Sequence, residues 1–283
     1  MTRRSMASQP AAFPDDAKIR SWNEYLKDPQ VLDTNLILNG SMLFRGQGDA
    51  DWGLVPSLVR ALRQVPERMT NDKALNIEET AQEEFAAQAH LYLSMAILNS
   101  VPTIVHWWMH MQHYSAPTRL LDWTYSPFVA AYFACCDHPN KDGAVWALDI
   151  NAGHFEMPKG FEDSATPEER NRLNKMFTSA EAPPRLHFIN MGLRNERMIA
   201  QQGVFMLSEN VQNTHEQILF SLRKEPDNAA RIRKLRIPAE QKREFLRQLH
   251  VMNINARSLF PGLDGLGKSI GEMIVLTTMW KME

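Results

Sequence analysis

The stretch QHYSAPTRLLDWTYSPFVAAYFACC, residues 112–136, places polar and charged side chains inside a strongly apolar run. Arg119 and Asp122 are flanked by leucines and a tryptophan. A charge in such a setting is costly unless it is paired. Two interpretations stay open: Arg119 and Asp122 form a buried ion pair that fixes the segment, or they join Thr118 in a polar functional cluster.

The second half of this stretch predicts a helix over residues 127–134. Ser126 stands before Pro127, and the residues that follow are rich in Ala and Phe. Serine is a favoured N-cap residue, and proline is favoured at the first helical position. The free amides of a helix start also favour an anion. Capping alone accounts for Ser126, but Thr124 and Ser126 are also candidate ligand-binding residues.

Length and composition limit the classes of protein to which the chain can belong. A formal net charge of -2 over 283 residues gives no broad basic surface for duplex nucleic acid, although local basic residues at 231–236 leave nucleic-acid binding open. The only two cysteines are adjacent, so they cannot build a thiolate zinc cluster. No apolar run is long enough for a membrane span, and the N-terminal residues contain no apolar core of signal-peptide length. We therefore expect a cytoplasmic protein that does not insert into a membrane.

The order of the periodic segments predicts an α+β fold, with a helical first half packed on a mixed, mainly antiparallel sheet. We expect residues 1–16 to be a flexible lead-in and residues 17–283 to form one domain. Helices are expected at 17–26, from Pro56, at 76–99, 104–113, 127–134, 167–177 and 239–253, with a glycine-rich loop and a terminal helix at the end. Strands are expected at 41–45, 144–150, 185–188, 203–208, 218–222 and 234–237.

Arg45 ends the first expected strand, and Gly46 and Gln47 follow it. A guanidinium offers a planar fork that matches phosphate or carboxylate, and a glycine lets a ligand approach the backbone. This pattern favours an anion site at Arg45. The alternative is that Arg45 pairs with Asp49 or Asp51 in the loop that follows.

His113 and Tyr114 end an apolar helix. A histidine there can act as an acid or base, and with Asp122 it offers a hydrolase or nuclease as one hypothesis. A structural histidine is the simpler interpretation. His106, His110 and His113 share helical spacing, but no carboxylate accompanies them, so we predict no metal site.

Several motifs, in order along the chain, together resemble the FRG domain. They are LFRGQ (43–47), WGLVPSLVR (52–60), QHYSAPTRLLDWT (112–124), SPFVAAYFA (126–134), RMIAQQGVF (197–205) and LFPGLDGL (259–266). Each motif is weak alone, and their combination is specific. The family usually has glycine where this chain has Ser115, which bears on the backbone conformation of that turn.

The same order of features is more distantly similar to ADP-ribosyltransferases. A strand ends in Arg-Gly, hydroxyl residues precede a helix rich in Ala and Phe, and Q-x-x-V-F enters a later strand. The resemblance implies an ADP-ribosyltransferase-like core with NAD as substrate. It implies that Arg45 holds an NAD phosphate or ribose, that Thr124 and Ser126 lie by the nicotinamide ribose, and that Gln201 begins the glutamine-x-glutamate pattern.

The resemblance departs from its pattern at Gly203, which stands where such enzymes carry a catalytic glutamate. Another carboxylate would have to replace it, and Asp122, Glu196 and Glu209 are the candidates. The sites expected on this basis are catalytic residues Arg45, His113, Tyr114 and Asp122, and NAD-binding residues Arg45, Gln47, Arg119, Thr124, Ser126, Gln201 and Gln202, with Tyr114 or Trp123 stacked on a ring.

The function expected first is therefore an NAD-binding ADP-ribosyltransferase or NAD glycohydrolase. It would act as a toxin or anti-phage effector, and its expected partner is a macromolecular target or a regulatory antitoxin-type protein. The alternative is a non-catalytic module that binds a nucleotide, a nucleic acid or a partner protein.

Overall fold

A computed structural model describes residues 14–67, 69–99, 101–151, 155, 158–160, 165–189, 196–224 and 231–277, with the side chains of residues 96 and 99 excepted. Its strands form one sheet in the order β1-β7-β4-β2-β3-β6-β5. The strands are β1 (Ala17–Lys18), β2 (Met42–Gln47), β3 (Leu121–Thr124), β4 (Gly143–Asp149), β5 (Leu186–Ile189), β6 (Gly203–Ser208) and β7 (Ile232–Ile237).

Helices surround this sheet, so the expected α+β class is confirmed. They are α1 (Trp22–Lys27), α2 (Thr34–Leu38), α3 (Ser57–Leu62), α4 (Asn71–Ala89), α5 (Met95–Asn99), α6 (Ile104–His113), α7 (Pro127–Cys135), α8 (Pro167–Thr178), α9 (Glu196–Ala200), α10 (His215–Arg223), α11 (Ala239–Val251), α12 (Ala256–Leu259) and α13 (Leu263–Thr277). Among the described strands only β1 and β7 pair in parallel, which confirms a mixed, mainly antiparallel sheet.

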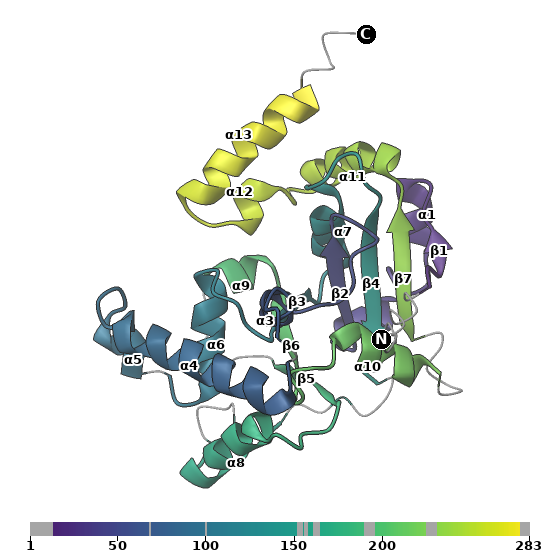
Figure 1. Ribbon diagram of the computed structural model, residues 1–283. Coiled ribbons are helices and arrows are strands. Elements are labelled where there is room, and N and C mark those ends of the chain that lie inside the picture. The colour runs from purple at the N-terminus through teal and green to yellow at the C-terminus, as the bar shows by residue number, and fades with distance from the viewer. Residues whose placement is uncertain are drawn as a thin grey trace, which may run out of the picture.

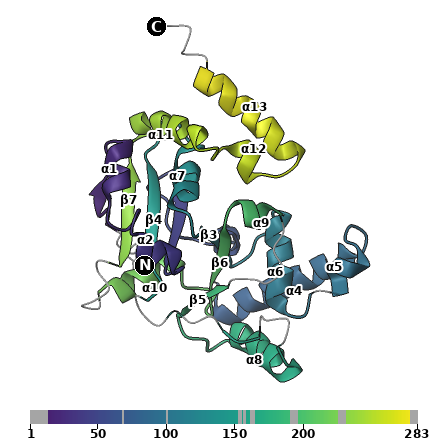
Figure 2. The same ribbon diagram turned by 180° about the vertical axis from the view of Figure 1, so that it is seen from behind.

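The sheet consists of two halves that meet at a single residue pair. β2 pairs with β4 along its whole length, and β3 pairs with β6 along its whole length. Between β2 and β3 the register contains only Phe44 opposite Thr124. In Figures 1 and 2, α1 and α11 lie with the half that contains β7, and α4, α6 and α8 lie with the half that contains β5 and β6. Beyond the shared pair, β2 and β3 diverge.

Helix α7 packs very closely on the β2 half of the sheet. Ser126 caps it as expected, because its side chain accepts a hydrogen bond from the Val129 amide. A Cβ atom built on Gly46 would lie 1.9 Å from the carbonyl oxygen of Ala130, and one on Gly143 would lie 2.2 Å from that of Ala134. The structure thus requires Gly46 for helix packing, a role different from the close approach of a ligand that the sequence indicated.

The core divides between the two faces of the sheet. On the α7 face, Phe44 and Val145 pack with Phe245 and Leu249 of α11. The opposite face carries a second cluster, with side chains from β2, β3, β4 and β6: Leu43, Leu121, Trp123, Trp146, Leu148, Val204 and Met206. Alternation along β2 and β4 sends successive side chains to opposite faces, so both faces of these strands are buried.

Arg119 is fully buried, and each of its three guanidinium nitrogens has an acceptor. Its Nε lies 2.9 and 3.0 Å from the two carboxylate oxygens of Glu78 in α4, and its Nη2 also contacts that carboxylate. Its Nη1 donates to the backbone oxygens of Ser208 and Glu209, at 3.2 and 3.0 Å. Its guanidinium carbon lies 4.5 Å from the centre of the Trp108 ring. One side chain therefore ties α4, α6 and the end of β6 to the start of β3.

The ion pair expected between Arg119 and Asp122 is therefore wrong. Asp122 lies in β3, where successive side chains point to opposite faces, and its side chain is exposed. Glu78, in contrast, is buried beside Arg119. Glu78 belongs to the group of early carboxylates in the long helix, so the sequence contained no local sign that it was the partner.

Several element boundaries differ from the expected ones. The strand expected at 218–222 is wrong, because these residues lie in α10, where Thr214 and Gln217 form a capping box. Residues 17–18 form β1 ahead of a shorter helix, and the helix expected at 76–99 is divided into α4 and α5. The strand β3 was not expected. Met252, expected to face inward, is 43% exposed.

The glycine-rich segment near the C-terminal end is helical. α13 begins at Leu263 and contains Gly265, whose missing Cβ would lie 1.7 Å from the carbonyl oxygen of Phe260. Figure 1 shows α13 standing out from the body above α7 and α11. Among the described helices, none is both long and apolar enough to cross a membrane.

Replacing Glu78 by Ala should leave Arg119 as a buried, unpaired charge and lower the free energy of unfolding by about 3–5 kcal/mol. Urea unfolding followed by circular dichroism measures this change. Glu79→Ala, on the exposed side of the same helix, is the matched control and should cost less than about 1 kcal/mol. Equal losses in the two variants would show that the ion pair does not stabilise the fold.

Candidate functional site

A cavity of about 180 Å³ lies where β2 and β3 diverge. Residues from β2, β3, α7 and α9 line it, together with the residue that follows α9: Phe44, Arg45, Gly46, Asp122, Trp123, Thr124, Phe133, Arg197 and Gln201. Four of the expected site residues therefore meet in one cavity, although they come from three separate sequence motifs. These four are Arg45, Asp122, Thr124 and Gln201.

Arg45 bridges the gap between the two strands. Its Nη1 donates to the backbone oxygen of Asp122, while its buried Nε makes no hydrogen bond within the described part of the chain. Burial lowers the pKa of the guanidinium, and the carboxylate of Asp122 opposes this effect. A buried donor without an acceptor is costly, so Arg45 has an unused hydrogen-bond donor in a residue that lines the cavity.

The alternative partners proposed for Arg45 are engaged elsewhere. Asp51 pairs with Arg236, at 2.9 Å, and a side-chain oxygen of Asp49 accepts from the amide of Asp51 at 2.9 Å. The pairing of Arg45 with either aspartate is therefore wrong. The loop carboxylates stabilise the loop and β7, which leaves the guanidinium of Arg45 to the cavity.

Asp122 supplies a carboxylate to the cavity, and Gln112 orients it. The Nε2 of Gln112 donates to Asp122 at 3.0 Å, and the side-chain oxygen of Gln112 accepts from the hydroxyl of Thr118. Thr118 is buried, and its amide donates to the hydroxyl of Ser57 at 3.0 Å. The carboxylate thus lies at the end of a hydrogen-bonded series, of which sequence reasoning identified only Thr118 and Asp122 as polar candidates.

Thr124 and Gln201 shape the wall of the cavity. The Thr124 hydroxyl donates to the backbone oxygen of Gln201 at 2.7 Å and accepts from the Ser126 amide at 3.0 Å. The side-chain nitrogen of Gln201 donates to the backbone oxygen of Leu259 at 3.1 Å. Gly203 lies opposite Thr124 in the β3–β6 register, and a Cβ there would meet no atom closer than 3.5 Å.

Other expected site residues have structural roles outside the cavity lining. Gln47 donates to the backbone oxygen of Gly53 at 3.2 Å and accepts from the Trp146 indole at 2.6 Å. Arg119 is held by Glu78, as described above. Gln202 is exposed and adopts a φ of 48°, in the left-handed region. Ser126 caps α7.

His113 and Tyr114 lie at the end of α6, outside the residues that line the cavity. Their rings meet edge to face with centroids 4.9 Å apart, and Tyr114 is 55% exposed. Burial and the nearby charge of Arg197 lower the pKa of His113, which favours the neutral imidazole at pH 7. Ser115, which follows, adopts a φ of 65°, and this explains why glycine is usual at that position of the motif.

Arg197 is a second cation in the cavity. Sequence reasoning noted it as a possible pocket residue beside Arg194, which lies outside the described residues. Its guanidinium carbon lies 5.0 Å from the centre of the Phe260 ring. Phe260 in turn packs edge to face on Phe133, with centroids 6.0 Å apart. These two aromatic residues were missed, because nothing local in the sequence connects α7 with the end of α12.

His215 is a buried histidine that sequence reasoning also missed. It begins α10, is fully buried, and its two ring nitrogens make no hydrogen bond with standard geometry within the described residues. Burial, with the positive charges of Arg45 and Arg119, lowers its pKa to about 3. A neutral imidazole at this place avoids adding a third positive charge beside the two arginines.

The basic residues at 231–236 do not form a free cationic patch. Arg233 pairs with Asp28 at 2.8 Å, Arg236 pairs with Asp15 at 2.6 Å, and Lys234 lies 3.5 Å from Asp15.

In the described part of the chain, no group of three or more His, Cys, Asp or Glu side chains gathers as a metal ion would require. The two cations of the cavity are therefore the clearest basic feature with an open side.

The fold and the cavity define an α+β protein with a divided sheet and a cationic site at the division. Residues 40–143 match the family model of the FRG domain. This match supports the FRG family for the part of the chain that contains β2, β3, α7 and the Arg45 and Asp122 sides of the cavity. No curated protein and no solved structure matches the chain.

Protonation of His215 should make the protein sensitive to mild acid. In the unfolded chain His215 has a pKa near 6.5, whereas in the folded state its pKa is about 3. The unfolded state therefore binds more protons between these two values, and the free energy of unfolding falls as the pH drops through this window. Between pH 7 and pH 5 this histidine should account for a loss of about 2 kcal/mol.

Urea unfolding at the two pH values measures this loss, and His215→Leu should remove that part of it. The exposed His90, changed to Leu, is the control. An unchanged pH dependence in His215→Leu would contradict the assignment.

Proposed function

We propose that this FRG-domain protein binds NAD in the cavity between β2 and β3 and acts as an ADP-ribosyltransferase-like enzyme. It would transfer ADP-ribose to a macromolecular target or hydrolyse NAD. Through this activity the protein would act as a toxin or anti-phage effector. The observation that carries the proposal is Arg45, which lines the cavity and whose buried Nε has no acceptor among the described residues. A phosphate or ribose oxygen of NAD would supply that acceptor.

The convergence of the motifs supports the same proposal. The likeness to ADP-ribosyltransferases rests on an arginine at a strand end, hydroxyls before a helix and a glutamine ahead of a later strand. These are Arg45, Thr124 and Gln201, and all three line one cavity. Trp123 also lines the cavity, and its buried indole nitrogen has no hydrogen-bond partner among the described residues.

Asp122 is the carboxylate placed to take part in the chemistry. As the bond from the ribose C1′ to nicotinamide breaks, its electron pair leaves with nicotinamide, and positive charge develops on the ribose. A fixed carboxylate stabilises that charge. An oxygen nucleophile, from water or the target, then forms the new bond at C1′ and releases its proton. Glu209 is not available for this role, because it is buried and paired with His187 at 2.6 Å.

The test is release of nicotinamide from NAD by the purified protein, with NAD affinity measured by calorimetry. Arg45→Met should weaken NAD binding by about tenfold to a hundredfold, because charge-assisted hydrogen bonds contribute about 1.5–3 kcal/mol. Asp122→Asn should retain binding and lose turnover. Arg172→Met, on the exposed surface of α8, is the control. Absence of both binding and nicotinamide release in the unmodified protein would refute the proposal.

A second candidate is a non-catalytic nucleotide-binding module, and Gly203 is the observation that favours it. A glycine cannot hydrogen-bond a ribose hydroxyl through a side chain, and this one lies opposite Thr124 at the cavity wall. In this case NAD would bind in an Arg45-dependent manner and remain intact.

The two candidates differ in the result expected for Gly203→Glu. There is room for the new side chain, because the nearest atom to a Cβ at this position is 3.5 Å away. If the natural protein is a binding module, the new glutamate should confer nicotinamide release that the natural protein lacks. If the natural protein is an enzyme that uses Asp122, its own activity should already be measurable. Gly203→Gln is the matched control, since it adds the same bulk without the charge.

A further inference from the structure

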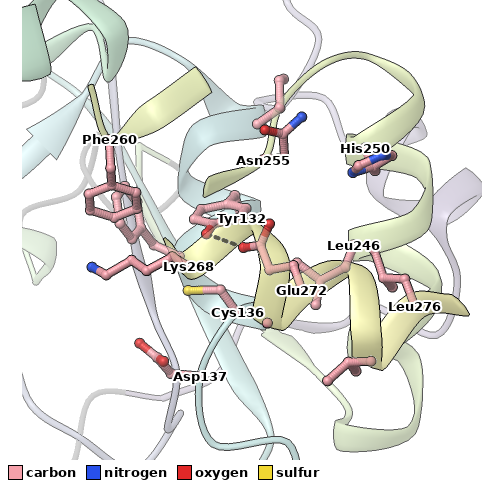
Figure 3. A pocket seen from close by; sticks show the side chains of 14 residues that line it. Tyr132, Cys136, Asp137, Leu246, His250, Asn255, Phe260, Lys268, Glu272 and Leu276 are labelled. Carbon is pink, nitrogen blue, oxygen red and sulfur yellow. Dashed lines mark hydrogen bonds between the residues drawn. The ribbon is translucent and has the colours of Figure 1, made fainter. Parts of the chain in front are cut away.

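A second and larger cavity, of about 330 Å³, lies beneath the C-terminal helix α13. Figure 3 shows its lining, which comes from α7, α11, α12, α13 and the segments next to them. Apolar side chains predominate, among them Leu246, Ile254, Val275 and Leu276. The proposed function assigns no role to this cavity.

The two cavities share a wall. Phe133 lines both of them, and Phe260, which packs on Phe133, lines the cavity beneath α13. A cation from each cavity lies over the Phe260 ring: the guanidinium carbon of Arg197 at 5.0 Å and the ammonium nitrogen of Lys268 at 3.9 Å. Neither cation is paired with a carboxylate within the described residues. Both cations therefore lie at the aromatic wall that the two cavities share.

Two carboxylates, those of Asp137 and Glu272, also line this cavity, and that of Glu272 has a structural role. One of its oxygens accepts from the hydroxyl of Tyr132, and the other accepts from the Ala256 amide at 3.0 Å. Figure 3 shows Glu272 and Tyr132 in contact across the cavity. These bonds hold α13 to α7 and to the start of α12, and so they keep the cavity open beneath the helix.

We propose that a dinucleotide occupies both cavities at once, an inference that rests on the proposed function. The nicotinamide ribose half lies beside Arg45 and Asp122, and the adenosine half lies beneath α13. The diphosphate crosses the wall at Arg197 and Lys268, because two negative charges match two unpaired cations. The apolar and aromatic lining of the larger cavity suits the face of a purine base.

Two glycines of α13 provide a matched pair of variants. A Cβ atom built on either glycine would have no other atom within 4 Å. Gly271 lines the cavity, whereas Gly267 does not. Gly271→Phe should fill the cavity and weaken NAD binding by about tenfold or more, which corresponds to about 1.4 kcal/mol. Gly267→Phe should bind NAD normally. Both changes replace a poor helix former, so neither should unfold α13.

Nicotinamide mononucleotide, which lacks the adenosine half, separates the two cavities in the same calorimetric experiment. Gly271→Phe should bind it as the natural protein does, whereas Arg45→Met should bind it weakly. Lys268→Met should weaken NAD binding and leave nicotinamide mononucleotide unaffected, with the exposed Lys175→Met as control.

The outcomes distinguish this inference from the proposed function. If Gly271→Phe binds NAD like Gly267→Phe, or loses both ligands together, the second cavity does not hold the adenosine half, and Arg45-dependent binding still stands. If the natural protein binds neither ligand, the proposed function fails, and this inference fails with it.

Discussion

The divergence of β2 and β3 is the constraint on which the candidate site depends. Each strand is fixed to its outer neighbour, β2 to β4 and β3 to β6, and α7 holds β2 from one face through Gly46. Neither strand can move to extend the single pair of Phe44 with Thr124. The backbone groups beyond that pair therefore need other partners. Arg45 supplies one by donating to the Asp122 carbonyl, and the remaining space is the cavity.

Two arginines of the chain illustrate the difference between a structural and a ligand-binding charge. Arg119 is surrounded by a carboxylate, two backbone carbonyls and a tryptophan ring, which leaves it no capacity for a ligand. Arg45 has one backbone acceptor and a buried nitrogen without one. In the sequence, both residues are simply charges next to apolar residues that form strands. Their roles separate only because their acceptors come from positions far away in the chain.

Local patterns in the sequence predicted a substantial part of the fold. The apolar runs located β2, β4 and β6, and Ser126 with Pro127 located the start of α7. The prediction failed where packing overrides an ambiguous pattern, as in α10, whose apolar residues at 218–222 also suit a strand. It also missed what only tertiary contacts create: the strand β3, the pairing of Arg119 with Glu78, and the aromatic wall of Phe133 and Phe260.

The most direct test of the account is the side-chain nuclear magnetic resonance signal of Arg45 in the protein labelled with ¹⁵N. The signal of its Nε–H group can be assigned by its loss in Arg45→Lys. We expect this signal to shift when NAD or ADP-ribose is added, because the Nε gains the acceptor that it lacks. The Arg119 signal should stay in place, since its acceptors are all within the protein. Saturating binding of either ligand without a change at Arg45 would contradict the central claim.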